Sequence, residues 1–207
     1  MPHRDYIKQY LNEAMAIADK LKEQEEQINR IISILFDAWE NDRWVFIEGN
    51  GGSASTATHF ASDLVKTINP SPEKRGLKAM ALVDNVPLVS ATTNDWGWEN
   101  LYLTQLRNYW VPESVVIGIS VHGGSGQDKA GNWSQNLLKG LQFAKDNGGK
   151  TIGFSGFDGG PMKDLVDACV VVPVNSTPHV ESFHVVLHHL IAFRLKELVD
   201  AHHKATL

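Results

Sequence analysis

Glu48-Gly49-Asn50-Gly51-Gly52-Ser53-Ala54-Ser55 follows directly on the apolar run Trp44-Val45-Phe46-Ile47. An apolar run that ends in a glycine cluster and continues into a helical pattern predicts a strand, an anion-binding turn and a helix. Glycines let the backbone approach a ligand closely, and a helix N-terminus offers unpaired N–H groups. Ser53 and Ser55 add hydroxyl donors at the same place. We therefore expect the ligand to be a phosphorylated small molecule.

Composition narrows the class of protein. The 207 residues are 43% hydrophobic and 21% charged, which is typical of one globular domain. The net charge of −5 argues against nucleic-acid binding. No apolar run approaches the ~20 residues of a membrane helix, and the polar start lacks the apolar core of a secretory signal. The single cysteine, Cys169, is expected in the core. A cytoplasmic protein that contacts neither nucleic acid nor membrane is predicted.

The first 42 residues have a helical pattern. Apolar side chains recur at steps of three and four residues, first from Ile7 to Leu21 and again from Ile28 to Trp39. The polar run Lys22–Gln27 between them predicts a bend or an exposed turn. A helical segment of this length either covers the core of its own domain or packs against another subunit, and its length favours the second role.

After residue 42, short apolar runs alternate with helical patterns. The predicted strands are Trp44–Glu48, Lys78–Val83, Val115–Ser120, Thr151–Ser155 and Ala168–Val172. The predicted helices are Ser53–Thr67, Glu99–Asn108, Gln127–Asn147, Met162–Val166 and Val180–Ala201. Apolar strands separated by helices indicate a parallel sheet covered on both faces. We expect a single α/β domain over residues 1–207, with a helical segment at 1–42 and a doubly wound core of five parallel strands at 43–200.

Two loops should form the ligand site. In such sheets ligands bind beyond the carboxyl ends of the strands, where the glycine loop at 49–55 and the loop Ser120–Gly126 both fall. Two Ser/Gly-rich loops on one edge predict a phosphate cradle. Ala54 breaks the G-x-G-x-x-G pattern, and no Gly-Lys-Ser/Thr follows, so no nucleotide cofactor is expected. Taken alone, the glycine cluster also fits a tight turn without a ligand.

The segment Val180–His189 carries a second candidate site. Three histidines and a glutamate lie in a mostly apolar helical pattern, and burying them without partners is unfavourable. Glu181, His184 and His188 share one face, whereas His189 points about 80° away. Any one of these histidines is expected to be an inert interface residue, but at least one of the group is expected to be functional.

His59 and Asp63 form a third candidate group. They stand at i and i+4 of a predicted helix, a spacing that lets two side chains share a metal ion or a proton network. Such a pair on its own is more often a surface contact.

Several short motifs occur in one order along the chain: Gly49–Ala54, His59–Ala61, Asp84–Val86, Asn94–Gly97, Gly118–Ser120, Gly124–Gly126, Gly156–Gly160 and Glu181–His184. Together they resemble the flavodoxin-like sugar isomerase (SIS) fold and, within it, the phosphoheptose isomerase family. The resemblance covers residues from about 40 to 200. It implies a cytoplasmic homotetramer with active sites at subunit interfaces. It also implies conversion of sedoheptulose 7-phosphate to D-glycero-D-manno-heptose 7-phosphate through an enediol.

The resemblance also implies roles for individual residues. Asp63 and His189 match the family's catalytic acid/base pair. A zinc ion, where the family has one, would be held by His59, Asp63, Glu181 and His189. The substrate-binding residues would be Asn50, Gly51, Gly52, Ser53, Asp95, Ser120, His122, Ser125 and Glu181, with the phosphate on Ser53, Ser120 and Ser125.

Three site residues depart from the family. Asp63 replaces a glutamate and is one methylene shorter, which moves a base by about 1.5 Å, a misplacement that affects rate. Glu181 replaces a glutamine and makes the site more anionic and a better divalent-metal site. His122 replaces a serine. A phosphosugar ligand is still expected, while the heptose itself is less firmly implied.

The position of His189 leaves alternatives open. Eight helical residues separate Glu181 from His189, or about 12 Å along the axis, so both would have to lean inward to share one ion. We follow the family for His189 and keep His184 and His188 as alternatives.

A non-catalytic function is the main alternative to an enzyme. Replication-initiator-binding SIS tetramers bind a phosphosugar or a protein partner but lack the acid/base carboxylate and the late histidine. Asp63 and His189 are both present here and favour the enzyme. A SIS sensor of sugar phosphates, which usually carries a DNA-binding domain, is a third hypothesis.

Overall fold

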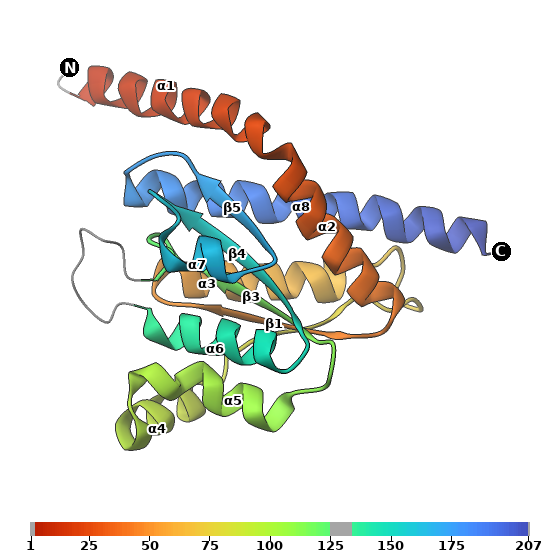
Figure 1. Ribbon diagram of the computed structural model, residues 1–207. Coiled ribbons are helices and arrows are strands. Elements are labelled where there is room, and N and C mark those ends of the chain that lie inside the picture. The colour runs from red at the N-terminus through yellow and green to blue at the C-terminus, as the bar shows by residue number, and fades with distance from the viewer. Residues whose placement is uncertain (1–2, 125–133, 207) are drawn as a thin grey trace.

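The computed structural model describes residues 3–124 and 134–206. The chain begins with helix α1 (His3–Leu21), a short 3-10 turn η1 (Lys22–Gln24) and helix α2 (Glu25–Glu40). Figure 1 shows α1 projecting away from the rest of the molecule and the chain changing direction near η1. The predicted bend between the two helical stretches therefore lies in the polar run. Among the described helices, none is both long enough and apolar enough to cross a bilayer.

Five parallel strands form one sheet in the order β2-β1-β3-β4-β5. They are β1 (Trp44–Gly49), β2 (Lys78–Ala81), β3 (Val115–Ile119), β4 (Lys150–Gly156) and β5 (Ala168–Val172). The centre is aliphatic, because Ile47 pairs with Ile117 and Ile117 with Ile152. The predicted doubly wound sheet is confirmed, and β2 is shorter than predicted because it ends at Ala81.

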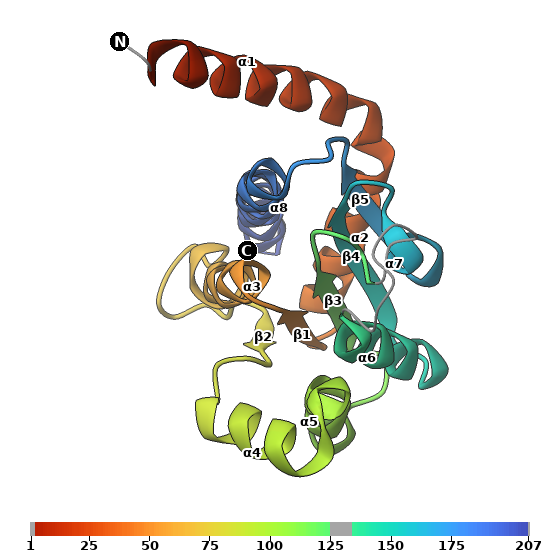
Figure 2. The ribbon, with the colours of Figure 1, turned by 90° about the vertical axis from the view of Figure 1, so that its left-hand side faces the viewer.

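Helices cover both faces of the sheet. They are α3 (Gly52–Ser62) with a π-helical turn η2 (Asp63–Thr67), α4 (Val86–Trp96), a 3-10 turn η3 (Trp98–Asn100), α5 (Leu101–Tyr109), α6 (Gln135–Asp146), α7 (Gly160–Leu165) and α8 (Thr177–Ala205). Figure 2 shows α3 and α8 on one side of the sheet and α5 and α6 on the other. The start of the predicted helix Gln127–Asn147 lies outside the described residues.

Each face has its own apolar core. Toward α2, α3 and α8 the strands present residues such as Ile47 and Phe154, which pack against Leu35, Phe60 and Leu187. Toward α5 and α6 they present Phe46 and Val116, together with Leu101, Leu106 and Leu141 from the helices. Alternate residues of β1 therefore point to opposite cores, as the pleat of a strand requires.

Helix α4 is not among the helices predicted from the sequence. Its run Val86–Trp96 contains β-branched residues and lacks a clear apolar period, which hides it from a periodicity argument. The signal is at its start, where the Asn85 side chain accepts a hydrogen bond of 3.1 Å from the backbone N–H of Leu88 and Pro87 lies in the first turn.

Glutamine side chains cover the edge strand β5. The Val171 backbone N–H donates to Gln24 Oε1 at 2.8 Å, and Gln24 Nε2 donates back to the Val171 carbonyl. Gln27 Oε1 accepts a bond of 3.3 Å from the Cys169 N–H. The exposed backbone of an edge strand invites pairing with other chains, and these amides satisfy it from within the molecule.

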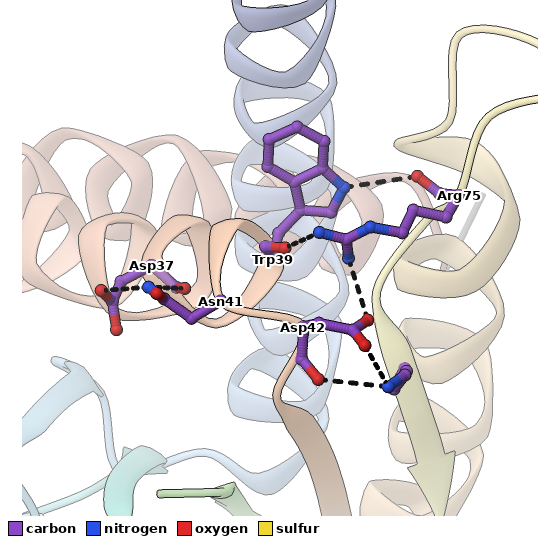
Figure 3. A network of polar contacts seen from close by, with 6 residues as sticks. Asp37, Trp39, Asn41, Asp42 and Arg75 are labelled. Carbon is purple, nitrogen blue, oxygen red and sulfur yellow. Dashed lines mark hydrogen bonds and ion pairs between the residues drawn. The ribbon is translucent and has the colours of Figure 1, made fainter.

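A polar network fixes the end of α2 beside the first strands (Figure 3). The Arg75 guanidinium donates to the Trp39 carbonyl, lies 5.2 Å from the centre of the Trp39 ring and forms a 3.3 Å ion pair with Asp42. Asp42 also pairs with Lys78, the first residue of β2. These contacts hold the amino-terminal end of the sheet, opposite the edge that carries the candidate site.

Candidate active site

The glycine loop connects β1 to α3. Gly51 has φ of 57° and ψ of −124°, a conformation that glycine adopts far more readily than other residues, and α3 begins at Gly52. Gly51 and Gly52 are exposed, whereas Ser53 is buried. The start of α3 therefore lies at the carboxyl edge of the sheet, where an anion site is expected. The Ser53 and Ala54 N–H groups donate within the turn, to the Asn50 and Gly51 carbonyls at 3.0 Å.

Tyr102 and Asn136 support this loop from below. The Tyr102 hydroxyl donates to the Gly49 carbonyl at 2.5 Å and to Asn50 Oδ1 at 3.2 Å. Asn50 and Asn136 exchange side-chain bonds of 3.0 and 2.8 Å. Burial, together with the nearby Glu48 carboxyl, raises the pKa of Tyr102, so its hydroxyl remains a donor at neutral pH. The loop is thus held in one conformation before any ligand binds.

The two Ser/Gly-rich loops converge on a small cavity, as predicted. The cavity of about 130 Å³ is lined by five of the predicted substrate-binding residues, namely Asn50, Ser53, Ser120, His122 and Glu181. Gly52 adjoins it, because a Cβ at this position would lie 2.3 Å from Glu181 Oε1. Gly51, next in the loop, and Asp95, on α4, are exposed and do not line the cavity. Ser125 falls outside the described residues.

Four side chains come together where α3 meets α8. His59 and Asp63 come from α3 and the start of η2, and His188 and His189 from α8. Asp63 Oδ2 lies 3.5 Å from His188 Nδ1, 3.6 Å from His189 Nε2 and 3.7 Å from His59 Nε2. Nε2 atoms of His59 and His189 are 3.4 Å apart. The structure therefore has a carboxylate surrounded by three imidazoles, a group able to exchange protons or hold a metal ion.

The adjacent residues His188 and His189 both reach Asp63 because they use different nitrogens. Neighbouring positions on a helix point about 100° apart, so the two rings approach the carboxylate from different sides. His188 is fully buried and presents the near nitrogen, Nδ1. The His189 side chain is 43% exposed and presents the distal Nε2. Sequence reasoning treated these two histidines as alternatives, whereas the fold brings both to the same carboxylate.

His184 has a different environment. It is fully buried, and its Nε2 lies 3.1 Å from the carbonyl of Ser155 at the end of β4. Burial lowers the pKa of His184 to about 4, so the ring is neutral at pH 7 and donates this bond. This histidine ties α8 to the sheet and does not belong to the group around Asp63.

Comparison with known proteins identifies the family. Residues 9–156 match the SIS domain. The chain belongs to the SIS-domain family. This SIS protein is 35% identical over 184 residues to the phosphoheptose isomerase of Helicobacter pylori (strain P12). The aligned residues cover 89% of this chain and 90% of the relative. It therefore also belongs to the phosphoheptose isomerase family, as the motifs indicated.

Two further relatives define how far the likeness extends. The SIS chain is 39% identical over 162 residues to the lincomycin biosynthesis protein LmbN of Streptomyces lincolnensis, covering 76% of this chain but 58% of LmbN. A solved structure of a phosphoheptose isomerase from Francisella tularensis superposes with a TM-score of 0.84 at 22% identity, over 95% of this chain and all of that one. The predicted SIS fold is thus confirmed.

The metal set implied by the family is only partly assembled within this SIS chain. His59, Asp63 and His189 meet, but Glu181 turns toward Gly52 and the cavity below the glycine loop. The two parts of the site lie along α3: six residues separate Ser53 from His59, or about 9 Å along the axis and about 120° of rotation. The cavity and the His/Asp group are thus neighbouring but distinct.

The sequence did not predict the residues that hydrogen-bond to the glycine loop and hold it in place. Tyr102 and Asn136 each contact the glycine loop, and nothing in their local sequence marks them. Glu48 ends a predicted strand, yet it is fully buried next to the glycine loop, and neither of its carboxyl oxygens is hydrogen-bonded within the described chain. A charged residue type inside an apolar strand was the available signal.

Proposed function

We propose that this protein is an aldose–ketose isomerase of sugar phosphates that converts sedoheptulose 7-phosphate to D-glycero-D-manno-heptose 7-phosphate. The proposal rests mainly on one observation: the Asp63 carboxylate, surrounded by three imidazoles, lies near the cavity formed by the two Ser/Gly-rich loops. Membership of the phosphoheptose isomerase family supports the substrate. A non-catalytic phosphosugar binder would have no use for a buried carboxylate of this kind.

The inert end of the substrate would bind at the glycine loop. The hydroxyls of Ser53, at the start of α3, and of Ser120, directly after β3, line the cavity and are donors that match phosphate oxygens. Ser125 directly follows Gly124 in the sequence and is proposed as a third hydroxyl donor. The phosphate would then fix the sugar with its carbonyl end directed toward α8, and Asn50 would contact its hydroxyls.

The reaction moves one proton between adjacent carbons. Asp63 would take the proton from C1 of the ketose, the C1–C2 enediol would form, and the proton would return to C2. His189 would carry the matching proton from the C1 oxygen to the C2 oxygen through Nδ1, because its Nε2 faces Asp63, and atoms and charge balance. The exposed side of the His189 ring makes it the accessible imidazole for a substrate oxygen.

The His/Asp group suits a divalent cation, and we propose Zn²⁺. Asp63 Oδ2 and both ring nitrogens of His188 are buried without hydrogen-bond partners among the described residues, and nitrogen and carboxylate oxygen are ligands that Zn²⁺ prefers. When bound, the ion would polarise the substrate carbonyl and lower the energy of the enediolate. Asp63 would contribute Oδ2 to the ion and keep its other oxygen for the carbon-bound proton.

We infer a cytoplasmic homotetramer with active sites at subunit interfaces. Helix α1 exposes Tyr6, Ile7, Leu11 and Met15, each more than half exposed. An apolar groove of about 510 Å³ runs between α1–α2 and α8. Apolar surface of this extent on projecting helices favours burial against other copies of the chain. Assembly is also the route by which Asp95, remote from the cavity of its own chain, would reach a substrate.

A substrate assay tests the function. Purified protein supplied with zinc is expected to convert sedoheptulose 7-phosphate to an aldoheptose 7-phosphate, followed by chromatography of the products. Ketose phosphates of five and six carbons serve as controls for chain length. If none of these sugars turns over while phosphosugars still bind, the protein is a binder and the isomerase proposal is wrong.

A further inference from the structure

We propose that His188 is a metal ligand in this protein and takes the coordination position that the family resemblance gives to Glu181. The metal centre would then consist of His59, Asp63, His188 and His189, three imidazoles and one carboxylate from a single chain. The inference rests on the metal site of the proposed function and names its donor set.

Four of the six distances among the donor atoms are close to those of ligands around one ion, and all six are within 4.8 Å. With metal–ligand bonds of about 2.0–2.1 Å in a tetrahedral site, neighbouring donor atoms lie about 3.3–3.4 Å apart. The separations from Asp63 Oδ2 to the three imidazole nitrogens are 3.5, 3.6 and 3.7 Å, and that between His59 and His189 is 3.4 Å. These distances exceed those of good hydrogen bonds, so the four side chains are gathered together without strong pairwise bonds.

His188 is the member whose burial most needs an explanation. The ring is fully buried, and neither nitrogen has a hydrogen-bond partner within the described residues. It packs on Phe60 with ring centres 5.3 Å apart and on His59 at 4.6 Å, so its orientation is fixed. An apolar side chain would fill this position without leaving polar atoms unpaired. Coordination through Nδ1, which faces Asp63, gives the imidazole a partner.

Glu181 has another environment. Its carboxylate lies against Gly52 and lines the cavity with Asn50 and Ser53. It stands seven residues before His188, about 10 Å away along the α8 axis, and is not part of the group of donor atoms that lie within 4.8 Å of one another. The carboxylate is therefore available to the substrate rather than to the ion.

This donor set changes the properties of the centre. A divalent ion with one carboxylate and three neutral imidazoles keeps a net charge of about +1, whereas a second carboxylate would cancel it. The His59 and His189 side chains are 49% and 43% exposed, so the ion would be open to a fifth ligand from that side. An ion with a higher net positive charge that is accessible from one side is suited to bind a substrate carbonyl oxygen.

Metal binding distinguishes the two donor sets. Zinc affinity is measured by competition with a chromophoric chelator for the wild type, His188→Leu, His188→Asn and the matched variant Glu181→Gln. We expect the zinc affinity of both His188 variants to fall by more than about 100-fold, because loss of a residue that only supports a ligand costs about 10- to 100-fold. Glu181→Gln should change the affinity by less than about threefold. Circular dichroism verifies folding, and two His188 variants guard against failure of one to fold.

A second measurement needs no variant. X-ray absorption of the zinc-loaded wild type is expected to count three imidazole ligands, where the family set would give two. Two imidazoles, or a loss of affinity in Glu181→Gln with none in the His188 variants, would overturn the inference while leaving the isomerase intact. Absence of zinc binding in the wild type would overturn it as well, and the sugar-phosphate assay then decides separately whether the isomerase proposal stands.

Discussion

The carboxyl group of Glu48, on β1, packs against the backbone of Gly140, on α6. A Cβ at residue 140 would lie 2.2 Å from Glu48 Oε2, so a larger residue there would force the carboxyl group to move. Glu48 is fully buried, and burial raises its pKa well above the usual 4.5. Glu48 lies directly before the glycine loop in the sequence. The proposed phosphate site is therefore adjacent to a carboxylic acid that favours its neutral form.

Replacing this acid with its amide is expected to stabilise the protein increasingly as the pH rises. Above pH 4.5 the unfolded chain releases the Glu48 proton while the folded chain retains it, so wild-type stability falls with pH. Glu48→Gln removes this contribution, and its advantage in urea unfolding should grow by up to about 1.4 kcal/mol per pH unit until the folded-state pKa is reached. Glu23→Gln, an exposed change, serves as the control. An advantage that is constant from pH 5 to pH 8 would mean that Glu48 is ionised in the fold.

Alanine substitutions at two glycines with positive φ can distinguish the effect of backbone strain from an effect on ligand binding. Gly51 (φ 57°) and Gly148 (φ 73°) both have open space where a Cβ would project. Alanine at either position should therefore lower the free energy of unfolding by roughly 1–3 kcal/mol through the backbone alone. Only Gly51→Ala is expected also to weaken phosphate binding, measured as competitive inhibition by inorganic phosphate. Equal phosphate inhibition in both variants would contradict the role of the loop.

The sheet could be predicted from the sequence because buried parallel strands leave a local signal. Each of the five strands is an apolar run bounded by turn residues, and the glycine loop marks the first one. Helix α4 could not be predicted in this way, since its β-branched residues follow no apolar period and its start depends on one side-chain cap. The local sequence pattern thus predicts the strands of the sheet more completely than the helices that pack on it.

The site was predictable in part for a related reason. Asp63 and His59 are four residues apart on one helix, so their proximity follows from spacing alone. The meeting of His188 and His189 at Asp63 depends on how α3 crosses α8, and helix crossing has no local signature. Glu181 and His189 are far apart along the predicted helix, and the structure bears out that separation.

The exposed apolar stripe of α8 is expected to form a subunit interface. Val186, Leu190 and Phe193 recur at helical steps and are 52%, 47% and 54% exposed. Leu190→Asp would place a charge in that interface and should convert a tetramer to smaller species, measured by light scattering after gel filtration. Val111→Asp, at a similarly exposed position away from α8, should leave the assembly unchanged. A wild type that runs as a monomer would refute the proposed assembly.

Asp63 and His189 are expected to carry the proton transfers. Asp63→Asn keeps the shape of the side chain but removes the base, and His189→Ala removes the accessible imidazole. Each should lower kcat/KM by at least about 10²-fold, with inorganic phosphate binding unchanged because Ser53 and the glycine loop are untouched. Asp146→Asn, an exposed carboxylate on α6, should retain full activity. Wild-type turnover in Asp63→Asn would show that another group removes the C1 proton, and the next carboxylate to test would be Glu181, which lines the cavity.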